Sequence, residues 1–111
     1  MSLLSEIKTI ADNLEVPVET GKFSKTAPET YLVLVPLYDN YHLYADNKPN
    51  VDVEEVRISI FTKTNYLRLK KNIETNLLNA EITITDRHYV GHEDDTGYHH
   101  YVIDVEKEYL I

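Results

Sequence analysis

The segment VEEVRISIFTKTNYLRLKKNIETNLLNAEITITDRHY, residues 53–89, changes its hydrophobic period twice. Apolar and polar side chains alternate over residues 54–63, which is the period of a β-strand. Residues 65–79 switch to helical spacing, and residues 81–90 return to alternation. These runs predict a strand–helix–strand unit. The segment has no glycine-rich phosphate loop and no nucleophile elbow, so we expect it to pack against protein rather than to carry chemistry.

The helix of this unit is expected at about residues 65–78. Asn65 can accept a hydrogen bond from the first turn and so cap the helix. Arg68, Lys70 and Lys71 fall outside its apolar stripe. The stripe recurs at helical spacing and is expected to face the core; it consists of Tyr66, Leu69, Ile73 and Leu77.

The N-terminal part predicts a second helix at residues 2–14. Apolar side chains recur there at helical spacing, Ser2 or Ser5 can cap the helix, and Pro17 stops it. Residues 15–29 are polar and contain two prolines and a glycine, so we expect an exposed loop.

Residues 30–38 (TYLVLVPLY) predict a strand, in which Pro36 indicates a sheet edge or a bulge because it has no N–H. Asp39–Asn40 predicts a tight turn, and residues 41–44 predict a return strand, so that the two strands would form a hairpin. Residues 45–52 are expected to form a loop, and residues 98–109 a long final strand.

The predicted order is therefore αβββαββ within a single domain, residues 1–111. Short turns between strands, with helices before and between them, indicate an α+β fold. We expect a largely antiparallel or mixed sheet of about five strands with both helices on one face.

Composition narrows the classes of function. The chain has 111 residues, no cysteine and a formal net charge of −8. Disulfides and thiolate zinc sites are excluded, and the negative charge argues against binding of a nucleic-acid backbone. No apolar run is long enough to predict a membrane span, and the N-terminus lacks the features of a signal peptide. We therefore expect a cytoplasmic location in the cell.

Charge is unevenly distributed along the chain. Residues 57–87 carry six basic and three acidic side chains, whereas the segments on either side are acidic. The basic residues Lys63, Arg68, Lys70 and Lys71 could meet an acidic patch on a neighbouring copy, as in a head-to-tail ring contact. The alternative is an ordinary solvated helix face.

The cluster richest in potential metal ligands lies at residues 88–100, where His88, His92 and His99 accompany acidic residues. A hairpin could bring His88 or His92 opposite His99, but neighbouring His99 and His100 must point to opposite faces of the sheet. No recognised ligand spacing is present. We therefore predict a polar hairpin tip and no metal site, with metal binding in this region left open.

The sequence predicts no catalytic residue. None of the four serines lies in a nucleophile-elbow motif. The acidic pairs Glu54–Glu55 and Asp94–Asp95 would diverge on an extended backbone, so neither pair could share a proton. The nine tyrosines favour a protein that assembles with others, because tyrosine is enriched at protein interfaces. The alternative is that several tyrosines lie half-buried on the sheet.

The element order and three runs of sequence resemble the tail-completion and tail-terminator proteins of long-tailed phages and of prophages in Gram-positive bacteria. The runs are YLVLVPLYDNYHLYADNKP (31–49), EEVRISIFTKTNYLRLKKNIE (54–74) and ITITDRHYVGHEDDTGYHHYVIDVEKEY (82–109). The resemblance implies a virion protein without cofactor that forms a ring, typically of six subunits. Such a ring caps the tail tube of major tail protein and joins it to the head-connector proteins.

No residue motif of this family can be transferred to this sequence, so the candidate interface comes from the chain's own charges. We hypothesise that Lys63, Arg68, Lys70 and Lys71 pair with the acidic loop residues of a neighbouring subunit, namely Glu93, Asp94 and Asp95. The alternative function is a monomeric acidic binding or inhibitor module that occupies a basic partner. A monomer with its acidic residues on one face would favour that alternative.

Overall fold

The computed structural model describes residues 2–21, 27–45 and 48–110 as two helices and one five-stranded sheet. This architecture confirms the predicted α+β class and the predicted element order. The elements are α1 (Leu3–Asn13), β1 (Val18–Thr20), β2 (Thr30–Ala45), β3 (Lys48–Thr62), α2 (Tyr66–Asn79), β4 (Thr83–His92) and β5 (His99–Leu110).

The sheet is mixed, with strand order β1-β2-β3-β5-β4. Strand β1 runs parallel to β2, and every other neighbouring pair is antiparallel. Strand β3 lies at the centre, where Ile58 is paired with Leu34 of β2 and with Ile103 of β5. The alternating segment that predicted a strand is therefore the middle strand of the sheet.

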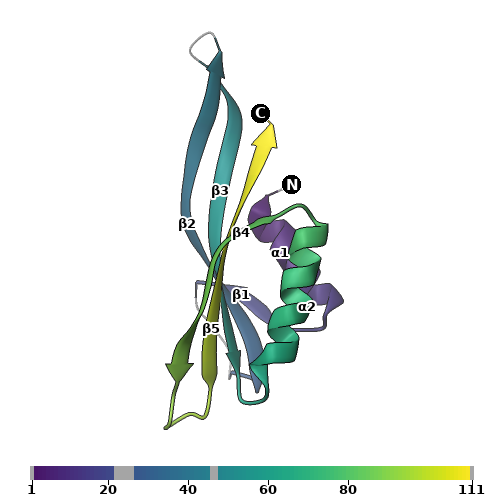
Figure 1. Cartoon of the computed structure of the whole chain (residues 1–111), viewed down its shortest axis with the longest axis vertical. Helices are drawn as coiled ribbons and strands as arrows, with labels where there is room; N and C mark the ends of the chain where they lie inside the picture. Colours follow the sequence, from purple (N-terminus) through teal and green to yellow (C-terminus); the bar gives the residue numbers. More distant parts are fainter. Residues whose placement is uncertain (1, 22–26, 46–47, 111) are drawn as a thin grey trace.

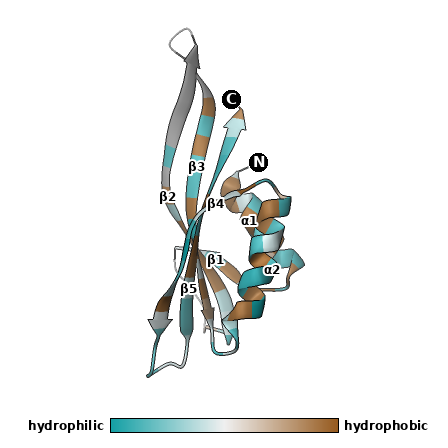
Figure 2. Cartoon of the chain, viewed as in Figure 1, coloured by the Kyte–Doolittle hydropathy of each residue, from teal (hydrophilic) through white to brown (hydrophobic). Residues whose placement is uncertain are grey.

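Both helices cover the same face of the sheet (Figure 1), as predicted. Helix α1 contacts β1, β2 and β3, helix α2 contacts β3 and β4, and the helices contact each other. In Figure 2 hydrophobic and hydrophilic residues alternate as bands along β3. The core fills this space with aliphatic side chains; it includes Leu3, Ile7, Leu32, Leu34, Val56, Ile58, Ile60, Ile73, Leu77, Ile82, Ile103 and Val105.

Both helices begin at residues that the sequence predicts as caps. At α1, the Ser2 hydroxyl accepts a hydrogen bond from the Ser5 backbone N–H, and Ser5 caps Ser2 in return. At α2, the Asn65 side chain accepts a hydrogen bond of 2.9 Å from the Leu67 N–H. Because these bonds satisfy N–H groups that have no partner inside the helix, the caps set where each helix starts.

The first turn of α1 is joined to β5 by a cluster of polar side chains. Lys107 of β5 donates to Glu6 of α1 at 2.9 Å, and the Tyr109 hydroxyl donates to the other Glu6 oxygen. Burial alone would raise the pKa of Glu6, but these two hydrogen bonds outweigh it and lower that pKa. Burial and the Glu6 carboxylate raise the pKa of Tyr109, so its hydroxyl remains a donor. Charge-assisted bonds of this kind stabilise the contact between α1 and the sheet.

The predicted loop at residues 15–29 is partly wrong. Val18–Thr20 form β1, a three-residue edge strand that pairs in parallel with Leu32–Leu34. The Leu32 N–H also donates to the Pro17 carbonyl at 2.8 Å. Such a short strand has too few residues for a recognisable alternation, so only its long-range partner reveals it. Residues 22–26 of the predicted loop lie outside the described residues.

The predicted turn at Asp39–Asn40 is also wrong. Strand β2 runs without interruption from Thr30 to Ala45, and Asp39 and Asn40 pair with Glu54 and Val53 of β3. The two predicted strands of the first hairpin are therefore one strand, and much of the predicted loop at 45–52 belongs to β3. Pairing along β3 supplies hydrogen bonds that outweigh the local turn preference of Asp–Asn. A register shift between Pro36 and Tyr38 confirms the predicted bulge.

The two longest strands extend beyond the rest of the sheet as an arm (Figure 1). The pairing of β5 with β3 ends at Val51, whereas β2 and β3 remain paired as far as Ala45 and Lys48. The molecule is consequently elongated, with principal extents of 55 × 24 × 23 Å. Two-stranded ribbons are only marginally stable alone, so the arm depends on its continuity with the rest of the sheet.

Candidate functional site

The predicted basic residues divide into two groups. Lys63 and Lys70 already have partners within the chain: the Lys63 Nζ atom lies 4.9 Å from the Tyr98 ring centroid, and the Lys70 Nζ atom lies 3.7 Å from Glu74. Arg68 and Lys71 are exposed on α2. These two cations are therefore the members of the predicted set that face outward from the helix.

The predicted acidic residues form the turn between β4 and β5. The Glu93 N–H donates to the Tyr98 carbonyl at 2.8 Å, and the Gly97 N–H donates to the Glu93 carbonyl at 2.7 Å. Asp94 accepts from the ring of His92 at 3.0 Å, and Asp95 is exposed. This turn lies at the same end of the molecule as the start of α2 (Figure 1). Pairing between the two groups in neighbouring copies remains a prediction.

The histidines adopt the predicted arrangement. His92 is paired with His99 across the hairpin, with ring centroids 4.7 Å apart, and His100 points to the opposite face. Within the described residues, no group of three or more potential ligands is placed to hold a metal ion. The Nδ1 atoms of both rings are occupied, since His92 contacts Asp94 and His99 contacts the Tyr89 hydroxyl.

Several tyrosines predicted to favour an interface instead join parts of this chain. The ring of Tyr66, at the start of α2, stacks on Tyr89 and Tyr101 at centroid distances of 5.2 and 5.5 Å. The Tyr98 hydroxyl donates to the Pro28 carbonyl at 2.5 Å. These rings fix the position of α2 and of the segment before β2. The side chains of Tyr38, Tyr41 and Tyr44 lie outside the described residues.

The acidic pair Glu54–Glu55 diverges, as predicted. Glu54 points toward the helices and accepts a hydrogen bond of 3.0 Å from the Leu3 N–H. Glu55 points to the other face of the sheet. Ser2 and Ser5 are used in the helix cap, and Ser59 lies on the opposite face from the helices.

That opposite face, called here the open face, carries an aromatic row that the sequence analysis missed. Tyr31, Phe61 and His100 are paired neighbours on β2, β3 and β5. The ring centroids of Tyr31 and Phe61 lie 5.0 Å apart, and those of Phe61 and His100 lie 4.2 Å apart. Burial lowers the pKa of His100, so its ring tends to stay neutral. The row presents a continuous aromatic surface across three strands.

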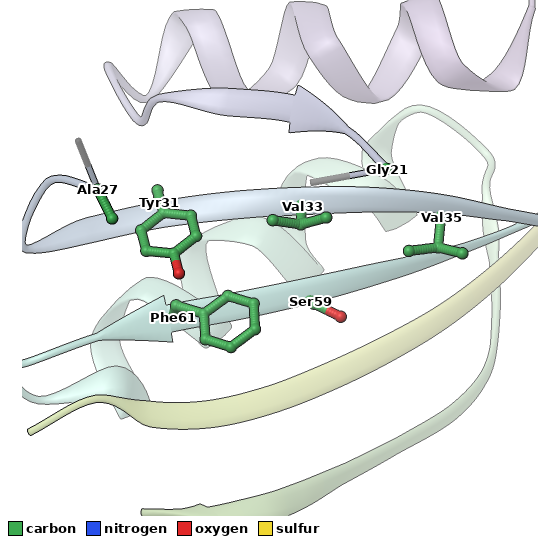
Figure 3. A pocket seen from close by; sticks show the side chains of 7 residues that line it. All are labelled: Gly21, Ala27, Tyr31, Val33, Val35, Ser59 and Phe61. Atoms are coloured by element: carbon green, nitrogen blue, oxygen red, sulfur yellow. The ribbon is translucent and has the colours of Figure 1, made fainter. Parts of the chain in front are cut away.

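A shallow hollow of about 390 Å³ lies beside this row (Figure 3). Its floor includes buried Val33 and Ser59, and Val35 at the rim is 36% exposed. Among the described residues, none of the side chains lining it is acidic, basic or histidine. An apolar side chain of a partner therefore suits this hollow better than a charged ligand; its lining consists of Gly21, Ala27, Tyr31, Val33, Val35, Ser59 and Phe61.

Beyond the hollow, the open face becomes acidic. Arg57 donates to both oxygens of Asp104 at 2.8 and 3.0 Å, and Asp86 is the register neighbour of Asp104. The Asp104 hydrogen bonds, with a smaller contribution from Asp86, raise the pKa of Arg57. Glu55 and Glu106 are direct register partners on the same face. In this region the carboxylates of Glu55, Glu106, Asp104 and Asp86 outnumber the guanidinium of Arg57.

Glu55 is the least well satisfied of these carboxylates. Its Oε2 atom is buried and has no hydrogen-bond partner among the described residues. Like charges directly opposite each other on a sheet are destabilising, and a buried carboxylate oxygen without a donor costs free energy. Glu55 as a whole is half-buried, so a cation supplied by another molecule would meet the exposed part of this carboxylate and offset its repulsion from Glu106.

One signal in the sequence could have indicated the open face. Residues 31–35 (YLVLV) are apolar at every position, and so are most of residues 58–61 (ISIF). Strands with apolar side chains on both faces are typical of sheets covered on both sides. The helices of this chain cover one side only.

No model of a known protein family and no curated protein matches the sequence. No helix of the described residues is both long and apolar enough to cross a membrane.

Proposed function

We propose that this protein is a structural component of a phage or prophage tail: a tail terminator or completion factor that caps the tail tube. It acts as a ring and joins the tube to the head connector. The observation that supports assembly best is the open face, which no helix of the described residues covers. Val35 is 36% exposed there and Tyr31 and Phe61 are partly exposed, although Val33 and Val102 on the same face are buried. The tail role itself comes from the resemblance of the three quoted runs of sequence.

The charge of the protein is compatible with this role. A ring at the end of a tail tube must let DNA pass without holding it. A chain with a net charge of −8 repels a phosphate backbone wherever its acidic side chains face the lumen. In this proposal the partners are other copies of the chain, the major tail protein and the head-connector proteins. The protein needs no cofactor or metal and catalyses no reaction.

The proposal is tested by inactivating the gene in its phage and imaging the particles by electron microscopy. We expect filled heads and separate tails in place of joined virions, and restoration of joined particles when the intact gene is supplied from a plasmid. A plasmid carrying a frameshifted copy provides the matched control. Normal joined virions in the absence of the protein would refute the proposal.

A second candidate is an acidic, non-enzymatic binding or inhibitor module that acts as a monomer. It is favoured by the carboxylates gathered on the open face, where Glu55, Glu106, Asp104 and Asp86 lie on three neighbouring strands. Light scattering of the purified protein, alone and with isolated tails, distinguishes the two candidates. A protein that stays monomeric in both conditions and leaves virion assembly unaffected would favour the binding module.

A further inference from the structure

The outer face of α2, which points away from the sheet, carries both apolar and basic side chains. Leu67 is 53% exposed and Leu78 is 61% exposed, and they lie about three turns apart on the same side of the helix. Exposed Arg68 and Lys71 lie between them. The acidic residue of α2, Glu74, is buried and contacts Arg87 and Lys70. The outer face is therefore basic and has leucines at both ends.

The open face of the sheet has the complementary properties. Its hollow is lined mainly by apolar and aromatic side chains, and its charged region carries more carboxylates than cations. Glu55 in that region lacks a donor for one buried oxygen. A partner surface that carries a leucine and a cation at suitable spacing would fill the hollow and neutralise a carboxylate of the charged region at the same time.

The two faces lie on opposite sides of the molecule, because α2 packs against one side of the sheet and the open face is the other side (Figure 1). Complementary surfaces on opposite sides of one chain cannot meet within that chain. They can meet between copies, and such contacts are head-to-tail and build rings when the rotation between copies closes.

We propose that the outer face of α2 in one copy packs on the open face of the next copy, with Leu78 in the hollow and Lys71 beside Glu55. The contact covers the second side of the sheet with a helix and gives the Glu55 carboxylate a cation. This inference rests on the self-assembly in the proposed function and specifies the interface that produces it.

The spacing of the groups on the two faces agrees. Ser59, on the floor of the hollow, and Glu55 are four residues apart on β3, which corresponds to about 13 Å along a strand. Leu78 and Lys71 are seven residues apart on α2, which corresponds to about 10 Å along a helix. The long, flexible lysine side chain spans the difference of about 3 Å. A single position of α2 can therefore place Leu78 in the hollow and Lys71 beside Glu55.

Disulfide cross-linking tests this interface directly, because the chain contains no cysteine. Two single variants, Val35→Cys and Leu78→Cys, are mixed at high concentration, with and without isolated tails, and oxidised. We expect a disulfide-linked heterodimer between them. A chain carrying both substitutions should form a ladder of linked oligomers, since its two cysteines lie on opposite sides of the sheet and cannot bond to each other.

Two control pairings show whether the contact is specific. Asp12→Cys, an exposed position on α1, measures random collision when it is mixed with Val35→Cys. Asp95→Cys mixed with Leu78→Cys tests the alternative contact between α2 and the acidic loop. Cross-linking of Leu78→Cys to Asp95→Cys but not to Val35→Cys would overturn the inference and leave the proposed function intact. Absence of cross-links above the collision level in every pairing would overturn the inference and weaken the proposed ring as well.

A charge exchange tests the ionic part of the contact. Lys71→Glu or Glu55→Lys alone should lower the yield of the Val35–Leu78 disulfide about tenfold, because each places like charges together. The two changes on opposite partners of a mixed pair should restore the yield. Unchanged yields for both single variants would remove Lys71 and Glu55 from the interface.

Discussion

The two faces of the sheet differ in how their apolar side chains are covered. On the helix side, Ile58 and Ile103 are fully buried beneath α1 and α2. On the open face, Val35 remains 36% exposed at the rim of a hollow, and stacked rings lie beside it. Val33 and Val102 on the open face are buried as well, so the faces differ in that helices cover one of them, whereas Val35 on the other remains exposed. We expect from this difference that folding depends mainly on the first face, and in the proposed function assembly uses the exposed part of the second.

The largest expected difference between the faces is in stability. Ile58→Ala should reduce the free energy of unfolding by about 3 kcal/mol, because it removes buried methyl groups and leaves a cavity at the centre of the core. Val35→Ala, on the open face, should cost less than about 1 kcal/mol. Urea unfolding at low protein concentration measures both values. Similar losses for the two variants would mean that the open face is also part of the folding core.

A smaller effect is expected at the contact between α1 and β5, on the helix side. Glu6→Gln should cost about 2 kcal/mol at neutral pH, because it weakens the charge-assisted bonds from Lys107 and Tyr109. The pKa of Glu6 in the folded protein lies below its ordinary value of 4.5. Its contribution is therefore present above the unfolded pKa and is lost as the pH falls through the folded pKa.

The difference between the wild-type protein and the Glu6→Gln variant should accordingly shrink below about pH 4.5. Unfolding measured from pH 3 to pH 7, values chosen to bracket that pKa, checks this dependence. Lys8→Gln, at an exposed position on the same helix, is the control. A constant difference across this range would show that the carboxylate charge does not stabilise the contact.

The smallest expected effect is of opposite sign and lies on the open face. Glu55→Gln should stabilise the isolated chain by about 0.5 kcal/mol, because it removes the like-charge pair with Glu106. The same variant should weaken association with the next copy. Thermal unfolding of the dilute protein measures the first effect, and the disulfide yield measures the second. A destabilised monomer would show that Glu55 has a folding role that the open face does not suggest.

Much of the helix-covered side was predictable, because its signals are local. Asn65 caps α2 where the sequence places it, and Ile73 and Leu77 of the predicted stripe are buried. The charged side chains of β5 alternate with its core residues as the period requires, since Asp104 lies between buried Ile103 and Val105. Helical and strand periods repeat within a few residues, so a single sequence displays them.

The errors concern features that depend on distant residues. Asp39–Asn40 has the composition of a turn, but its pairing with Val53 and Glu54 keeps β2 extended. Val18–Thr20 become a strand only because Leu32–Leu34 lie beside them. The hollow on the open face is lined by residues of β2 and β3 together with Gly21 and Ala27. Because these residues are far apart in the sequence, no single run could reveal the hollow.

The sequence by itself determined the α+β class, both helices and the side of the alternating strands β3, β4 and β5 that faces them, because these depend on spacing and composition along the chain. Only the tertiary structure decided which residues lie beside one another across the sheet. It placed Tyr31 beside Phe61, Glu55 beside Glu106, and the outer face of α2 opposite the open face. The physical reason is that the register between strands is set by hydrogen bonding and packing over the whole sheet.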